Sequence, residues 1–230
     1  MLTGRKCLVL AMPVVASLST AWYVPTREGD DDAALRKKAL SLNNVTGDDP
    51  IKGEIKALVE DPPGTKKLLA VAAKMAREKN QPFNYNGAFI LGNAALTLRD
   101  AEAGRALFRV CFEQAAKVRS PQKMSQAYLG MEAMIDLLYL EKKYDQSAKA
   151  AQEFLEVLEK LEQEGLSKAL KSDVLRRMVR AMAKQGKSTE ATRMVDNLIK
   201  VRPTDWRNYE LRAYLERENR NYSAAIKAYE

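Results

Sequence analysis

The sequence predicts an all-α fold in which paired helices stack into an array. Ala, Leu, Glu, Lys and Arg, which all favour helices, dominate the 230 residues, and only 11 Gly and 8 Pro interrupt them. The alternation of β-branched and aromatic residues that strands need is nearly absent. An internal repeat adds a third observation, because a step of 34 residues carries Leu175 to Tyr209 and Ala191 to Ala225. One such repeat cannot bury its apolar stripe alone, so neighbouring repeats must stack.

Residues of fixed type mark the parts of this repeat. Gly186 suits the turn between two helices, the small Ala191 lets the helices cross closely, and Pro203 ends the unit. In these residues and in its 34-residue period the chain resembles the tetratricopeptide-repeat family. The resemblance implies a right-handed α-solenoid in which the first helix of each pair lines a concave groove that grips peptides or partner helices.

The resemblance extends to earlier units with longer repeats. The family pattern recurs at Leu91, Gly92, Gly104, Phe108 and Cys111. The step from Gly104 to Ser147 is 43 residues and the next, to Ala191, is 44, as expected for helices lengthened by two or three turns. Ala88 and Ala95 depart from the pattern, because the family prefers an aromatic residue at both positions.

The chain divides into three predicted parts. Residues 1–24 read as a signal peptide or membrane anchor, because Arg5 and Lys6 precede a charge-free run from Cys7 to Tyr23, and a buried N-terminal helix is the alternative. Residues 25–82 are expected to form a linker and capping helices, and residues 83–230 a repeat array truncated at its C-terminus. This division favours an exported or membrane-anchored protein of the cell envelope, the periplasm or the extracellular space. A cytoplasmic protein is the alternative.

Three helices are expected within residues 25–82. They cover residues 33–42, 51–60 and 66–79, with a loop over residues 41–50. Pro62, Pro63 and Gly64 are expected to break the chain, and Thr65 to cap the helix that follows. Further on, Ser120 and Pro121 predict the start of a long helix.

Composition and motifs argue against catalysis. The chain has no histidine, which removes imidazole acid–base chemistry and histidine-assisted zinc sites. Phosphate-binding glycine loops, nucleophile elbows and paired-cysteine motifs are also absent from the sequence, so we expect no enzyme, cofactor or metal. Of the two cysteines, Cys7 lies in the leader and Cys111 on an apolar helix face, where it is expected to fill the core.

The predicted function is a protein-interaction scaffold. The resemblance would place Asn93, Asp136, Tyr139, Arg176, Arg180, Lys184, Arg207 and Tyr214 in the groove. Arg176, Arg180 and Lys184 follow one another at four-residue steps, which puts them in one row that could clamp an acidic peptide or a terminal carboxylate. The family's dedicated carboxylate clamp is not reproduced, and an ordinary solvated face is the alternative to the row.

Two other functions stay open. One is a helical-repeat protein that binds nucleic acid, although the net charge of +8 is spread over helix faces without a basic tract. The other is the docking arm of an enzyme whose catalytic domain follows residue 230. No small-molecule substrate is evident, and contact with a membrane is expected only through the N-terminal segment.

Overall fold

The described part of the chain is entirely helical. A computed structural model describes residues 28–162 and 168–229, and within these ranges it contains eleven α-helices, one short 3-10 helix and no strand. The all-α prediction is therefore confirmed. The elements are α1 (Glu28–Ser41), η1 (Leu42–Asn44), α2 (Asp48–Glu60), α3 (Pro62–Ala76), α4 (Tyr85–Thr97), α5 (Ala101–Lys117), α6 (Pro121–Leu140), α7 (Tyr144–Glu162), α8 (Lys168–Lys184), α9 (Ser188–Val201), α10 (Trp206–Glu218) and α11 (Tyr222–Tyr229).

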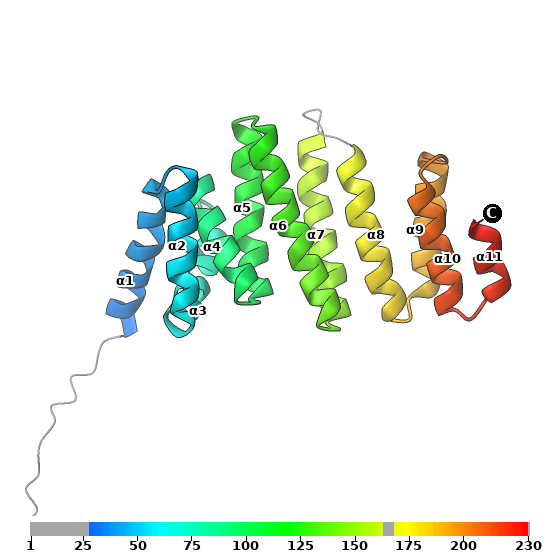
Figure 1. Ribbon diagram of the computed structural model, residues 1–230, viewed down its shortest axis with the longest axis horizontal. Helices are drawn as coiled ribbons and strands as arrows, with labels where there is room; N and C mark the ends of the chain where they lie inside the picture. The colour runs from blue at the N-terminus through cyan, green and yellow to red at the C-terminus, as the bar shows by residue number, and fades with distance from the viewer. Residues whose placement is uncertain (1–27, 163–167, 230) are drawn as a thin grey trace, which may run out of the picture.

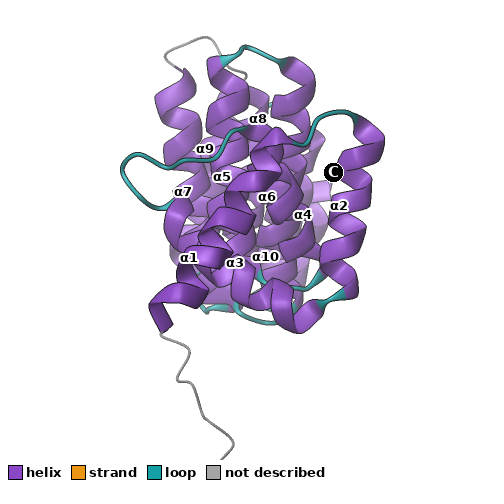
Figure 2. Ribbon diagram, turned by 90° about the vertical axis from the view of Figure 1, so that its left-hand side faces the viewer, coloured by secondary structure: helices purple, strands orange, loops and turns teal. Residues whose placement is uncertain are grey.

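The helices follow one another along the long axis of the molecule (Figure 1). From α2 onward each helix packs against the next in the chain, and α1 packs on η1 and α3. In addition, α4, α6, α8 and α10 touch in succession, as do α3, α5 and α7. Seen end-on, α2 and α4 lie on one side, and α1, α5 and α7 on the other (Figure 2). Among the described helices, none contacts one more than three helices away. Contacts are thus local, and the described residues do not close into a ring.

The turns between helices share one backbone conformation. A residue with positive φ ends α4, α5, α6, α8 and α10, and these residues are Arg99, Arg119, Lys142, Gly186 and Arg220. The next amide then donates to a carbonyl five residues back, as in Asp100 N to Ala95 O at 2.8 Å, which satisfies carbonyls at the helix end. The turns after α4, α6, α8 and α10 are 43, 44 and 34 residues apart. These are the same steps that the sequence pattern shows.

A small buried residue follows each of these turns on the second helix of the pair. Gly104, Ser147, Ala191 and Ala225 are all buried, and the Oγ of Ser147 donates to the carbonyl of Ile135 on α6 at 3.0 Å. At Ser147 a larger side chain would push α6 and α7 apart, because interhelical distance depends on the residues at the crossing. At Gly104 an added Cβ would instead meet Met134 of α6, so this glycine lets α5 pack closely on the next pair.

The N-terminal helices differ from their predicted bounds. The first begins at Glu28 instead of residue 33, and α3 begins at Pro62, four residues before the predicted start. The proline pair does not separate two helices by a loop but fills the first turn of α3, where a missing N–H costs nothing. The predicted cap at Thr65 was wrong: Asp61 accepts from Gly64 N at 3.2 Å, and the Thr65 hydroxyl donates to Leu58 O at 2.6 Å.

The start of α6 agrees better with the sequence prediction. The α6 helix begins at Pro121 with Ser120 as its cap, as predicted. The predicted signal peptide or anchor, residues 1–24, and Cys7 lie outside the described residues. In the part of the chain that is described, no helix combines the length and the apolar character needed to span a membrane.

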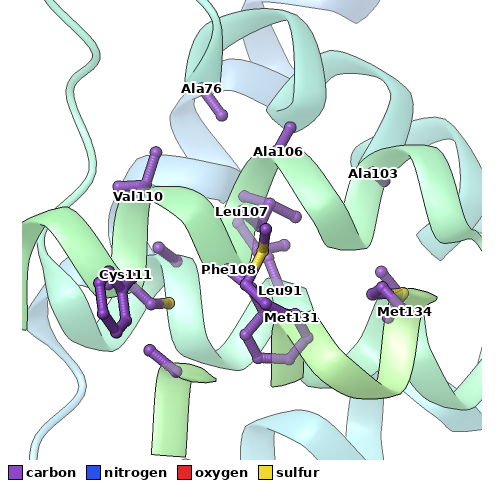
Figure 3. Packing of buried hydrophobic residues seen from close by; sticks show 14 of the residues in the cluster. Ala76, Leu91, Ala103, Ala106, Leu107, Phe108, Val110, Cys111, Met131 and Met134 are labelled. Carbon is purple, nitrogen blue, oxygen red and sulfur yellow. The ribbon is translucent and has the colours of Figure 1, made fainter. Parts of the chain in front are cut away.

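Phe108 on α5 packs against both neighbouring helices, α4 and α6. Its ring lies against Gly92 of α4 and Gly130 of α6, where a Cβ on either glycine would press on the ring. Leu91, Phe108 and Met131 gather in the same part of the core (Figure 3). Cys111 is fully buried on the same helix, so burial raises the pKa of its thiol and it fills space as predicted.

The apolar core is divided in two within α8. One cluster of buried side chains runs from Ala39 to Val174, and a second runs from Val179 to Leu215. The half-buried Leu175 and Met178 pack against both clusters. The helix α8 thus contributes to both parts of the core.

The glycines give a test of this packing. We expect Gly130→Ala to destabilise the protein by about 1–3 kcal/mol, because the added Cβ would overlap the Phe108 ring. Gly53→Ala is the matched control, because nothing lies within 4 Å of its added Cβ and alanine favours the helix by about 0.5–1 kcal/mol. Thermal unfolding followed by circular dichroism should give a lower midpoint for Gly130→Ala and a higher one for Gly53→Ala. An unchanged midpoint for Gly130→Ala would contradict the packing described here.

Candidate functional site

All eight predicted site residues lie on the even-numbered helices. Asn93 is on α4, Asp136 and Tyr139 are on α6, Arg176, Arg180 and Lys184 are on α8, and Arg207 and Tyr214 are on α10. These four helices touch in succession, and their exposed residues are here called the even-helix face. Polar contacts between helices cross this face repeatedly.

Arg177 joins α8 to α6. Its Nη1 lies 2.6 Å from Glu132 Oε1, and its Nε lies 3.0 Å from Asp136 Oδ1. Burial raises the pKa of the Glu132 carboxyl, which the Tyr128 hydroxyl and Arg177 offset only in part. The sequence analysis missed Arg177. The sequence does contain a clue to its role. Arg177 follows Asp136 by 41 residues, about one predicted repeat, and Glu132 and Asp136 are four residues apart, which puts both carboxylates on one face of a helix.

Arg176 is not available to a partner, which corrects the predicted cationic row. The residue is only 7% exposed, and it bonds Asp173 and Asp205 and, at 3.0 Å, the amide oxygen of Asn208. Asn208 is itself fully buried and donates to Leu198 O at 3.2 Å. Arg176 therefore anchors α10 to α8, and its charge is compensated within the protein.

Lys184 is also paired, at the other end of α8. Its Nζ lies 2.6 Å from Glu218 Oε2 and 5.9 Å from the centre of the Tyr214 ring. The hydrogen bond to Glu218 raises the pKa of Lys184. Tyr214 in turn shares a hydrogen bond with the hydroxyl of Tyr139 at 3.2 Å, which links α10 directly to α6. Burial raises the pKa of Tyr214, so its hydroxyl stays neutral.

Arg207 holds the first turn of α10. Its Nε and Nη2 lie 2.9 Å and 3.0 Å from the two carboxylate oxygens of Asp205, and its Nη1 lies 3.4 Å from Asp173. Asp205 is the N-cap of α10 and accepts from the backbone of Arg207. The hydrogen bond to Arg207, helped by the charge of Arg176, lowers the pKa of Asp205 to about 2.

Arg180 remains the exposed cation of the predicted row. In the described residues it has no ion pair or hydrogen bond, and it lines a pocket of about 180 Å³ between α6, α8 and α10. Trp206, whose side chain is 69% exposed, lines the same pocket. An arginine beside an exposed indole is a combination that protein interfaces favour. Both residues therefore line one pocket of the even-helix face, which Asp136, Asp173 and Glu210 also line.

Asn93 lies apart from this cluster. Its Nδ2 donates to Phe89 O within the same helix at 2.8 Å, and α4 contacts α6 but not α8 or α10. The structure thus brings the predicted residues of α6, α8 and α10 together and leaves Asn93 farther along the face. Within the described ranges, no group of three Cys, Asp or Glu side chains is placed to hold a metal ion.

Comparisons with known proteins do not identify a family. No family model matches the chain, and no curated protein or solved structure matches it. The relationship to tetratricopeptide repeats therefore stays a prediction from the residues.

The Asp205 carboxylate should make stability depend on pH under acid conditions. Its pKa is about 2 when folded, against 3.8 ordinarily, so its contribution is present above 3.8 and is lost as pH falls towards 2. Asp205→Asn keeps a capping side chain but removes this titration. In urea unfolding at pH 5 and at pH 2.5, we expect the variant to lose less stability than the wild type.

Asp49→Asn is the control for this measurement, because the Asp49 side chain is 98% exposed on α2. Equal acid sensitivity of Asp205→Asn and the wild type would contradict the role of the Asp205 carboxylate.

Proposed function

We propose that the chain is a non-catalytic scaffold that binds a segment of another protein along the even-helix face. The observation that supports the proposal is the local pattern of contacts, in which described helices touch only near neighbours and α4, α6, α8 and α10 touch in succession. Such surfaces bind extended segments or helices because they are long and their backbone is rigid.

The proposed architecture is a right-handed α-solenoid of tetratricopeptide-like pairs. It is supported by the turns at residues 99, 142, 186 and 220, whose spacing follows the small residues of the sequence pattern. It is also supported by the packing of α4 on α6, α6 on α8 and α8 on α10. In this proposal α1, α2 and α3 cap the first pair, α4 and α5.

The proposed contact point for the partner is the pocket at Arg180 and Trp206. Since Arg176 and Lys184 already hold carboxylates, Arg180 is the member of the row that retains an unused guanidinium. An acidic side chain of the partner would form charge-assisted hydrogen bonds with it, and an apolar neighbour would cover the indole. Tyr139 and Tyr214 lie farther along the same face and could continue the contact.

The pairing of charges favours a protein partner over nucleic acid. On the even-helix face, Arg177, Lys184 and Arg207 each lie within 3.0 Å of a carboxylate oxygen. A phosphate backbone needs a row of cations without acidic neighbours, since affinity grows with the number of phosphates neutralised. Nucleic-acid binding is therefore the weaker alternative.

The proposed location, exported or membrane-anchored, rests on the charge-free run from Cys7 to Tyr23 alone. N-terminal sequencing of the mature protein tests it. A new N-terminus after Ala21 would support export with cleavage.

A displayed peptide library tests the proposed partner chemistry. The wild-type protein should enrich peptides that carry Asp or Glu beside an apolar or aromatic residue. Arg180→Glu should lose the enrichment of acidic residues, and Trp206→Ala the enrichment of their apolar neighbours, each lowering affinity for a selected peptide about tenfold.

The matched control is Arg193→Glu, which makes the same change of charge at an exposed position of α9. It should leave the enriched sequences unchanged, and all variants should keep wild-type helicity. Selection of the same acidic peptides by Arg180→Glu would refute the proposed contact.

A further inference from the structure

A second pocket lies among the odd-numbered helices. It has a volume of about 380 Å³, and its lining comes from the end of α3, from α5 and α7, and from Met131 of α6. The charged residues around it are Arg77, Glu102, Arg105, Arg109, Lys149 and Glu153. Four cations thus surround it against two carboxylates. The two carboxylate side chains are exposed, at 71% for Glu102 and 47% for Glu153, whereas Arg105 is 18% exposed.

Arg105 is half-buried without full compensation of its charge. Its side chain is only 18% exposed, and its one carboxylate partner is Glu153, whose Oε2 lies 3.3 Å from Nη1. The Nε of Arg105 is buried and has no hydrogen-bond acceptor. A desolvated guanidinium normally has most of its N–H groups satisfied, because each unsatisfied buried donor destabilises the fold.

Arg109 lies one helical turn further along α5, and it also has an N–H group without a hydrogen-bond acceptor. Its Nε is also buried without an acceptor, and the nearest carboxylate oxygen, of Glu113, is 3.8 Å away. Its Nη2 donates to the carbonyl of Ala76 at 3.2 Å, which fixes one side of the guanidinium. Lys149 on α7 is exposed and has no partner in the described residues. Three cations of this pocket are therefore not fully paired within the described residues.

The shape and the rim of the pocket limit the ligand. Ala106 and Met131 are almost fully buried and give it apolar lining. A long polyanion or an anionic membrane would meet the exposed carboxylates of Glu102 and Glu153, which repel it. A compact phosphate group would compete only with Glu153 for Arg105, and the planar forks of the two guanidinium groups suit its oxygens.

We propose that this pocket binds a small phosphomonoester. Arg105, Arg109 and Lys149 hold the phosphate group, and the short organic part lies against Ala106 and Met131. The site is formed by α5 and α7 and is separate from the even-helix face, so it does not depend on the proposed scaffold function.

Isothermal titration at low ionic strength tests the proposal with inorganic phosphate and phenyl phosphate. We expect one saturable site for each probe, with phenyl phosphate binding more tightly because its ring covers apolar surface. Arg105→Gln and Arg109→Gln should each weaken binding about tenfold, because each removes a charged hydrogen-bond donor. Glu153→Gln should strengthen it, since it frees Arg105 from its carboxylate.

The Glu153→Gln result separates binding from folding, because a misfolded variant cannot bind more tightly. Arg193→Gln on α9 is the charge-matched control and should bind both probes like the wild type. The proposal is overturned if neither probe gives a saturable signal, if Arg193→Gln weakens binding as much as Arg105→Gln, or if Glu153→Gln does not strengthen it. Binding to vesicles that contain phosphatidic acid, without binding of the soluble probes, would also overturn it.

Discussion

The close crossing of paired helices is the constraint on which the rest of the structure depends. The second helix of the later pairs presents a small buried residue, Ser147 in α7 and Ala191 in α9. Close approach lets the apolar side chains around the crossing interlock, and this supplies the burial that a single pair lacks. Where a hydroxyl is enclosed there, as at Ser147, it bonds a carbonyl of the facing helix, so no polar group is left unsatisfied.

Polar contacts also connect successive helix pairs. Tyr85 bonds Gln126, Arg177 bonds Asp136, and these partners are 41 residues apart in both cases. Because each contact spans about one repeat, it fixes how one pair sits on the next without requiring contact between the ends of the array. The even-helix face owes its shape to these contacts, and most of its charges are already used in them.

The sequence predicted the helices and the repeat steps because both depend on local composition and spacing. Ser120 and Pro121 mark the start of α6 by a mechanism confined to four residues. The burial of Arg176 could not be predicted in this way. It depends on Asp205 and Asn208, which lie about one predicted repeat later in the chain. The four-residue spacing placed it on the correct helix but could not show that α10 covers it.

The division of the apolar core gives α8 a special place in the structure. Since one apolar cluster ends at Val174 and the other begins at Val179, α8 is shared between two regions that have separate interiors. In linear arrays each block gains stability mainly from itself and the adjoining block. The two apolar clusters are therefore joined through α8, where Leu175 and Met178 pack against both.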